Sequence, residues 1–208
     1  MAVINAGILS QVSGKVAGVV GGSWKGTNYL REYVIPSNPN TTAQQTQRTK
    51  FTDAVSFGKL ILGQILNVYV DVFQKSMSGF NYFIQQNITK FPITTNWASL
   101  KITFGKLYFG GISNAVVSAG SVAITTSQSL GSNGSASDKV FACAYVPDAG
   151  LMYFASAAVL RSAGTITVSG SGISVTTSVT VYAFAAAYDT NGVLTSVSDS
   201  SGYNITVG

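Results

Sequence analysis

The chain has 208 residues, of which 46% are hydrophobic and only 9% are charged, against about 25% charged residues in typical soluble domains. It contains no histidine and a single cysteine, Cys143, which excludes an internal disulfide, the commonest general base and the histidine ligands of most zinc sites. The net charge of +5 combines a basic first half, with ten Lys and Arg against three Asp and Glu over residues 1–106 (+7), and an acidic second half, with two against four (−2).

These counts favour a protein that is not an enzyme. The seven acidic residues are scattered singly, so the sequence offers no carboxylate pair for acid–base catalysis. No cofactor, metal or small-molecule substrate is therefore expected. Because few side chains are charged, copies of the chain repel one another weakly, which favours self-association. Only the basic first half would attract a polyanion.

Residues 1–40 are predicted to form an extended arm rich in glycine, aromatic and basic residues. Pro36 and Pro39 close this segment and favour extended backbone at the residues before them. The first twenty residues are apolar, but they lack a basic start and are interrupted by Gln11, Ser13 and Lys15. We therefore expect no signal peptide and no membrane span, and synthesis in the cytoplasm.

The segment SGKVAGVVGGSWKGTNYLR, residues 13–31, has the glycines and lysines of a phosphate-binding loop. Their spacing fits neither the G-x-x-x-x-G-K-[ST] loop nor the G-x-G-x-x-G fingerprint. Aromatic and basic residues do alternate here, as in proteins that bind single-stranded nucleic acid or grip a neighbouring subunit. The candidate contact residues of the arm are Lys15, Trp24, Lys25, Tyr29 and Arg31. The alternative is that these aromatics pack on a core and the bases are merely solvated.

Residues 41–92 are predicted to be helical. Thr41 or Thr42 followed by Gln44 or Gln45 resembles a capping box, and apolar residues then recur at helical spacing to Ile65. An irregular connection follows, and a second helix is expected over Ser76–Ile88, with Phe51 and Ile65 of the first helix packed against Phe80 and Ile84. Two further candidate contact residues, Arg48 and Lys50, lie in the first turns, where the helix dipole disfavours positive charge. They indicate a partner, although solvation alone also explains them.

Residues 93–208 are predicted to form an immunoglobulin-like β-sandwich, because seven short apolar or alternating runs are separated by Gly, Ser, Asn and Asp. The first run is SLKITFGKLYF, residues 99–109. Asp189–Val193, DTNGV, is the clearest hairpin turn, and residues 129–138 are expected to be a mobile surface loop. Cys143 lies in the apolar run VFACAYV, which predicts a buried, inert thiol. The predicted fold class is α+β.

The N-terminal elements SGK, WKG, NP-x-T-x-x-Q and Q-x-x-R-x-K-F, within residues 13–51, resemble the signature of an uncharacterised domain-of-unknown-function family abundant in Bacteroidota. MSGFNYFIQQNI and ITFGKL resemble its middle, and DKVFACAYVPDAGLMYF with VYAFAAAYDTNGVLTSVSDSSGY resembles its C-terminal strands. The resemblance covers nearly the whole chain. It implies no activity, since the family has none assigned.

Two functions from different classes remain open. The first is a structural, self-assembling protein, namely a capsid or minor structural component of a bacteriophage virion, whose arm contacts neighbouring subunits or nucleic acid. The second is a cytoplasmic nucleic-acid- or protein-binding module without catalytic activity. A surface adhesion domain of immunoglobulin type is disfavoured because no signal peptide is recognised.

Overall fold

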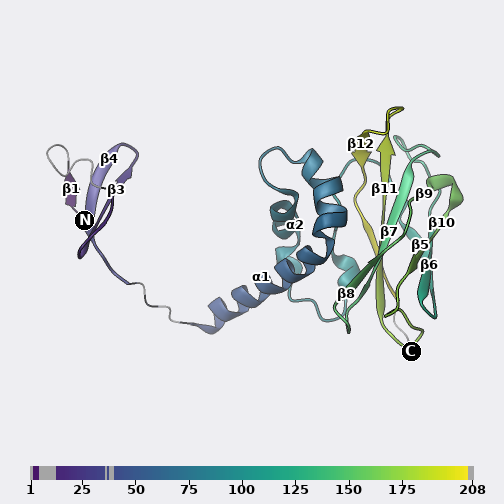
Figure 1. Ribbon diagram of the computed structural model, residues 1–208, viewed down its shortest axis with the longest axis horizontal. Coiled ribbons are helices and arrows are strands. Elements are labelled where there is room, and N and C mark those ends of the chain that lie inside the picture. The colour runs from purple at the N-terminus through teal and green to yellow at the C-terminus, as the bar shows by residue number, and fades with distance from the viewer. Residues whose placement is uncertain (1, 5–12, 36, 38–39, 206–208) are drawn as a thin grey trace. The chain divides into compact units, whose positions relative to one another are not determined.

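The computed structural model describes residues 2–4, 13–35, 37 and 40–205. They divide into two compact units, Met1–Thr42 and Ala43–Gly208. Figure 1 shows one sheet in the first unit, and helices and two further sheets in the second. The chain is therefore of the α+β class, as its sequence predicts.

The first unit is a four-stranded antiparallel sheet in place of the expected extended arm. Its strands pair in the order β1-β4-β3-β2. They are β1 (Ala2–Ile4), β2 (Gly14–Val16), β3 (Val19–Trp24) and β4 (Thr27–Glu32). The turn between β3 and β4 holds Lys25 and Gly26 at φ of 49° and 82°, and two successive positive φ angles are what a type I′ hairpin turn requires. Pairing also satisfies backbone groups that an extended arm would leave to water.

The second unit begins with helices. They are α1 (Thr42–Ile61), the π-helix η1 (Leu62–Val70), the 3₁₀ turn η2 (Asp71–Phe73), α2 (Gly79–Asn87) and the 3₁₀ turns η3 (Ile88–Lys90) and η4 (Trp97–Ser99). Two main helices are present as expected, but the irregular connection predicted after Ile65 continues as helix to Phe73. The side chain of Ser78 caps α2 by accepting a hydrogen bond from the amide of Asn81.

The packing expected of Phe51 is wrong. Phe51 is 54% exposed, whereas Phe57 is buried and packs on the rings of Phe83, Trp97 and Tyr145. Ala54 is the first buried residue of α1, so the helix meets the core about one turn later than its apolar spacing indicates. Ile65 and Ile84 are in the core as predicted.

Among the residues that the structure describes, Thr42–Phe73 is one helical stretch that is long and apolar enough to cross a membrane. A core helix passes the same test of length and composition. In this stretch 39% of the most apolar window is buried, and Ile61, Ile65 and Leu66 lie in the same cluster as residues of the six-stranded sheet.

The remaining strands form two antiparallel sheets (Figure 1). The three-stranded sheet, in the order β10-β6-β5, contains β5 (Ile112–Ser118), β6 (Ser121–Thr126) and β10 (Thr165–Ser169). The six-stranded sheet runs β12-β11-β7-β8, with β13 also on β11 and β9 also on β7. It contains β7 (Lys139–Val146), β8 (Leu151–Phe154), β9 (Val159–Leu160), β11 (Val179–Tyr188), β12 (Leu194–Val197) and β13 (Ser201–Ile205). The 3₁₀ turn η5 (Arg161–Ala163) precedes β10.

The six-stranded sheet is buried on both faces, and its two faces differ in side-chain size. Alternate residues of a strand point to opposite faces. On β7 and β11, Ala and Val side chains, such as Ala142 and Val181, pack in one cluster with the three-stranded sheet. Larger residues between them, such as Tyr145 and Tyr182, pack in the second cluster with the helices. Small residues therefore let the two sheets approach, and aromatics fill the wider space beneath the helices.

Residues 99–109, expected as a strand, are irregular apart from a single bridge from Leu107 to Ser198. Side chains replace the ladder partners of this segment. The amide of Ile102 donates to Ser200 Oγ, and that of Gly105 donates to Asp199 Oδ1. The apolar pattern of this segment therefore predicts correctly that Ile102 and Leu107 are buried in the core. It predicts a strand incorrectly, because the backbone here is irregular.

The loop over residues 129–138, expected to be mobile, is held by several bonds. Fully buried Arg161 donates to the carbonyl of Ser129 at 2.5 Å and to Asp138 Oδ2 at 3.2 Å. Asn133 accepts from the amide of Tyr108. The turn at Asp189–Val193 forms as predicted, with Gly192 at φ 78° and the Asp189 carboxylate accepting from two turn amides.

Candidate interaction face of the N-terminal sheet

The strand register of the N-terminal sheet brings four of the five arm candidates to one face. Lys15 pairs with Val20, which pairs with Arg31. Partners across a ladder lie on the same face, as do alternate residues of a strand. Val20, Gly22 and Trp24 of β3 therefore share that face with Tyr29 and Arg31 of β4. Tyr33, two residues beyond Arg31, belongs to the same row. We call Lys15, Trp24, Tyr29, Arg31 and Tyr33 the basic-aromatic face.

Side chains on this face contact one another. Lys15 Nζ lies 3.6 Å from the centroid of the Tyr33 ring, a cation–π contact. The Tyr29 ring covers Gly22, since a Cβ at Gly22 would lie 2.8 Å from the Tyr29 hydroxyl. Glycine is thus required there for the ring to lie on the sheet. Trp24, beside the turn, is 70% exposed.

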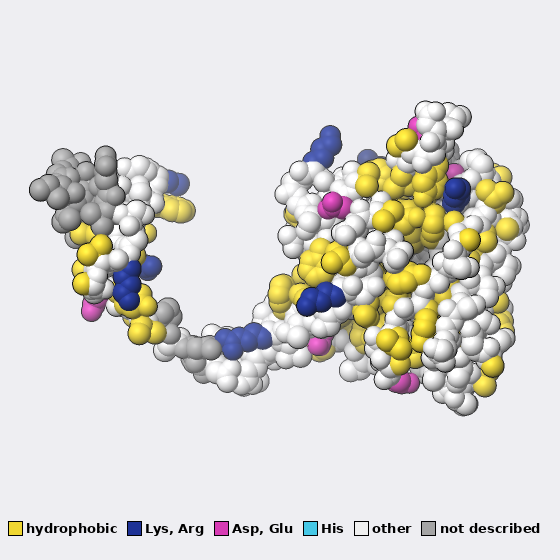
Figure 2. All heavy atoms as spheres, in the orientation of Figure 1, with side chains coloured by type: hydrophobic (Ala, Val, Ile, Leu, Met, Phe, Trp, Pro, Cys, Tyr) yellow, Lys and Arg dark blue, Asp and Glu magenta, His cyan; other side chains and the backbone are white. Residues whose placement is uncertain are grey.

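The described residues of the N-terminal unit bury almost nothing. Within residues 13–35 only Gly21 is buried. Val16 and Val19, which pair on the opposite face, are 61% and 40% exposed. Glu32, which pairs with Val19, lies on that opposite face. The basic-aromatic face therefore carries the cations Lys15 and Arg31 without this acidic residue beside them. Figure 2 shows basic and hydrophobic side chains next to one another on this unit.

The fifth arm candidate, Lys25, lies in the hairpin turn next to Trp24. Arg48 and Lys50 belong to the other unit, on the exposed beginning of α1. Arg48 lines a shallow groove with Gln44, Gln47, Phe51 and Thr52, which share one side of the helix. Arg48 is therefore a candidate separate from the N-terminal sheet, and Lys50, two residues further along the helix, does not share its side.

Burial favours the neutral form of two acid–base groups in the core. Burial raises the pKa of the Cys143 thiol and that of the Tyr182 hydroxyl well above their ordinary values. Both groups are thus kept in their neutral forms at physiological pH. In the described part of the chain, no group of three His, Cys, Asp or Glu side chains has the arrangement to hold a metal ion.

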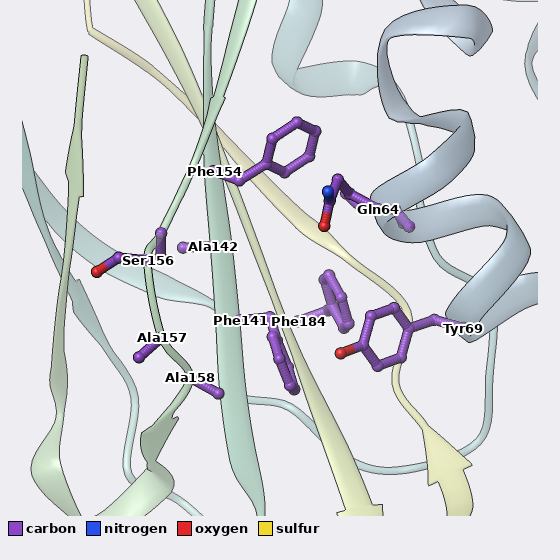
Figure 3. A pocket seen from close by; sticks show the side chains of 11 residues that line it. Gln64, Tyr69, Phe141, Ala142, Phe154, Ser156, Ala157, Ala158 and Phe184 are labelled. Atoms are coloured by element: carbon purple, nitrogen blue, oxygen red, sulfur yellow. The ribbon is translucent and has the colours of Figure 1, made fainter.

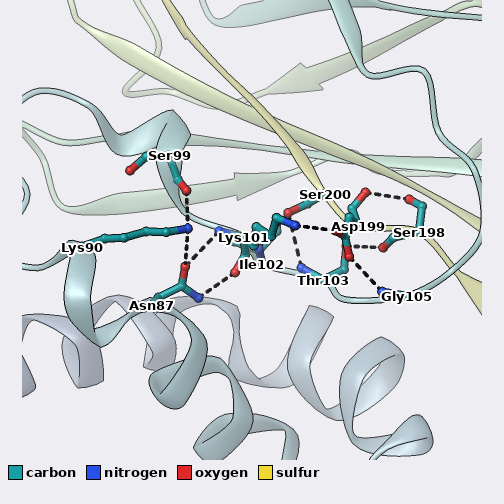
Figure 4. Close-up of polar contacts among 10 residues, drawn as sticks. All are labelled: Asn87, Lys90, Ser99, Lys101, Ile102, Thr103, Gly105, Ser198, Asp199 and Ser200. Atoms are coloured by element: carbon teal, nitrogen blue, oxygen red, sulfur yellow. Dashed lines mark hydrogen bonds and ion pairs between the residues drawn. The ribbon is translucent and has the colours of Figure 1, made fainter.

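A polar cluster, not anticipated from the sequence, joins α2 to the irregular segment and to the β12–β13 link (Figure 4). Buried Asn87 donates to the carbonyls of Phe83 and Lys101 at 3.0 and 2.9 Å and accepts from the amide of Lys101. Lys101 forms an ion pair with Asp199, whose other oxygen holds Gly105. These bonds fasten three segments that are distant in sequence, so we assign the cluster a structural role.

Sequence reasoning also missed an aromatic cavity of about 290 Å³ against the six-stranded sheet (Figure 3). Its lining comes from η1, β7, β8, β11 and the segment after β8, and includes Gln64, Tyr69, Phe141, Phe154, Ser156, Ala158 and Phe184. No sequence pattern links positions so far apart. The π-helical winding that presents Gln64 and Tyr69 has no sequence signal of its own.

With this geometry described, the comparisons with known proteins give one positive result. Residues 11–199 match the family described as "Family of unknown function (DUF6266)". The chain belongs to this family, in agreement with the resemblance found in its sequence. No curated protein and no solved structure matches the chain.

Proposed function

We propose that this is a structural, self-assembling protein that uses its N-terminal sheet to contact neighbouring subunits. The observation that carries the proposal is the basic-aromatic face, presented by a separate small unit in which Gly21 alone is buried among residues 13–35. A small sheet needs a packed apolar face to be stable in water. Contact with a second copy would supply that packing.

Exposed apolar side chains support the same proposal. Val34 and Ile35, after β4, are 68% and 77% exposed, and Trp24 is 70% exposed. Large aromatics with neighbouring bases are typical centres of protein interfaces. The face of the molecule in Figure 2 carries few charged side chains, so repulsion between copies would be weak.

We further propose that β5–β13 is an immunoglobulin-like sandwich, the type of module that tiles in shells and fibres. In chain order, the first, second and fifth strands make one sheet, and the third, fourth, sixth and seventh make the other when β8–β9 and β12–β13 are each taken as one interrupted strand. Immunoglobulin folds divide their strands in this way when the fourth strand joins the second sheet. Helices covering the outer face of that sheet distinguish this unit from a simple sandwich.

The most concrete form of the proposal is a capsid or minor structural subunit of a bacteriophage virion. Low charge, a sandwich module and a tethered basic sheet together suit a subunit that packs against its copies near nucleic acid. The test is negative-stain microscopy and light scattering of the purified chain. Symmetric oligomers or large particles are expected, and a stable monomer at high concentration would contradict the proposal.

The second candidate is a nucleic-acid-binding module, favoured by the placement of Lys15, Arg31, Trp24 and Tyr29 on one face. Bases stack on such aromatics while the cations contact phosphate. This candidate predicts binding to single-stranded DNA or RNA that weakens as salt is raised and that is lost when Lys15, Lys25 and Arg31 are changed to Ala. Absent or salt-independent binding would remove it.

A further inference from the structure

The aromatic cavity against the six-stranded sheet has walls that are fixed before anything enters it. Phe141 and Phe184 are cross-strand partners on β7 and β11, and their rings stack at 5.6 Å between centroids. The Tyr69 ring contacts both, at 4.9 Å from each. These three rings form one continuous apolar wall.

The cavity exists because the neighbouring edge strand is interrupted. β7 pairs with β8 as far as the Cys143–Phe154 pair and with β9 at Val140–Val159. Between them, residues 155–158 are Ala, Ser, Ala and Ala, and all four line the cavity. Side chains this small leave open the space that a larger residue would fill.

One polar group lies in the aromatic wall. Tyr69 is 7% exposed, and its hydroxyl accepts a hydrogen bond from Tyr188 at 3.4 Å. Among the described residues, Tyr69 is the acceptor in this bond and is the donor in no other. Burial raises the pKa of Tyr69 well above its ordinary value, so that proton is retained. Figure 3 shows Gln64 and Tyr69 projecting from η1 toward the phenylalanines of the sheet.

We propose that this cavity binds a small planar aromatic molecule carrying a hydrogen-bond acceptor, with the ring against Phe141, Phe154 and Phe184 and the acceptor on the Tyr69 hydroxyl. A volume of about 290 Å³ lies at the lower end for small-molecule sites, which fits a ligand of one or two rings. One wall of the cavity is the π-helix η1, and π-helical segments are frequent at functional sites. The ligand would be bound and not transformed, because the lining residues include no Asp, Glu, Lys, Arg, His or Cys that could activate the Ser156 hydroxyl. The site is independent of the N-terminal sheet and of the proposed assembly.

The test uses acetophenone, a planar ring with a carbonyl acceptor, and ethylbenzene, of similar shape without one, titrated calorimetrically into the full chain. Acetophenone should bind saturably at one site. Tyr69→Phe should weaken acetophenone about 3- to 10-fold, the range for loss of one hydrogen bond, and leave ethylbenzene unchanged. Tyr188→Phe removes the same tyrosine–tyrosine bond but keeps the Tyr69 donor, so acetophenone should bind it as it binds the wild type.

A second pair of variants tests the location. Ala158→Phe should fill the cavity and abolish binding of both compounds, whereas Ala149→Phe, in the exposed turn after β7, should not. The proposal is overturned if neither compound binds the wild type saturably, or if Ala158→Phe and Tyr69→Phe leave acetophenone binding intact. It is also overturned if Ala158→Phe changes the oligomeric state while the wild type binds neither compound, since the cavity would then be a subunit contact.

Discussion

Arg161 is the largest side chain that is fully buried, and it explains why the loop over residues 129–138 is held in place. Its guanidinium pairs with Asp138, which is 4% exposed, and its Cζ lies 5.8 Å from the centroid of the Tyr108 ring. Gly134 packs against the same group, because a Cβ there would lie 2.4 Å from Nη1. One arginine thus positions a loop whose composition alone indicates mobility.

Removing this arginine is expected to be costly. Arg161→Met leaves the Asp138 carboxylate buried without its cation and should lower the free energy of unfolding by about 3–5 kcal/mol, measured by urea denaturation. Lys101→Met is the control, since it breaks an ion pair whose side chains are 48% and 49% exposed and should cost about 1 kcal/mol or less. Equal losses in the two variants would contradict the structural role given to Arg161.

Because Cys143 and Tyr182 are buried, the free energy of unfolding is expected to change with pH in the alkaline range. Burial raises both pKa values from their ordinary 9.0 and 10.0, so between those values and the folded ones the folded state holds more protons than the unfolded state. Stability from these groups is complete below about pH 9 and falls as pH rises. The urea midpoint should decline between pH 8 and pH 10.5, and less steeply in Cys143→Ala. A midpoint that rises over this interval would show the opposite sign.

Among elements, the hairpin of β3 and β4 depends on one glycine that its turn requires. Gly26 has φ 82° with open space around its Cβ position, so a side chain there meets backbone strain and no clash. Gly26→Val should cost about 1–2 kcal/mol and speed amide hydrogen exchange over residues 19–32 about 5- to 30-fold, leaving β7 and β11 protected. Ser23→Thr, in exposed β3, is the control and should change little. Unchanged exchange in Gly26→Val would mean that this hairpin is not formed in solution.

Elements with strong local patterns were the predictable part of the fold. The Asp189–Val193 turn and two main helices are present as predicted. The six apolar runs that follow residues 99–109 all contain strands, although AVVSAGSVAITTS, LMYFASAAVLR and LTSVSDSSGYNITV each hold two. The strand expected over residues 99–109 failed because side chains of Asn87, Asp199 and Ser200 take its backbone bonds. Those partners are distant in sequence, so the alternation of apolar residues within the segment cannot predict them.

The candidate face was predictable in residue type and not in arrangement. Lys15, Trp24, Lys25, Tyr29 and Arg31 stood out through alternation of aromatic and basic residues. Their common face depends on two hairpins, and the flatness of that face depends on Gly22 beneath Tyr29. Of the glycines that first resemble a phosphate loop, Gly26 thus lies in a tight turn and Gly22 lies beneath the Tyr29 ring. Tyr33 also alternates with these bases in the sequence, but its contact with Lys15 depends on the pairing of the strands.

At the scale of the whole molecule, the chain joins a well-packed second unit to a small sheet with little burial of its own. The six-stranded sheet, covered on both faces, supplies a rigid body. The N-terminal sheet supplies exposed aromatics and cations. An assembly subunit needs both a stable body and an exposed contact surface. The proposed function therefore depends on the basic-aromatic face.

Sedimentation velocity of the full chain over a wide concentration range tests this dependence most directly. We predict that the wild type associates into a defined oligomer or larger particle, and that Lys15→Glu/Trp24→Ala/Arg31→Glu remains monomeric with an intact core by circular dichroism. A control variant of the second unit, Lys75→Glu/Val175→Ala, both exposed, should associate as the wild type does. A monomeric wild type, or a triple variant that associates normally, would contradict the account.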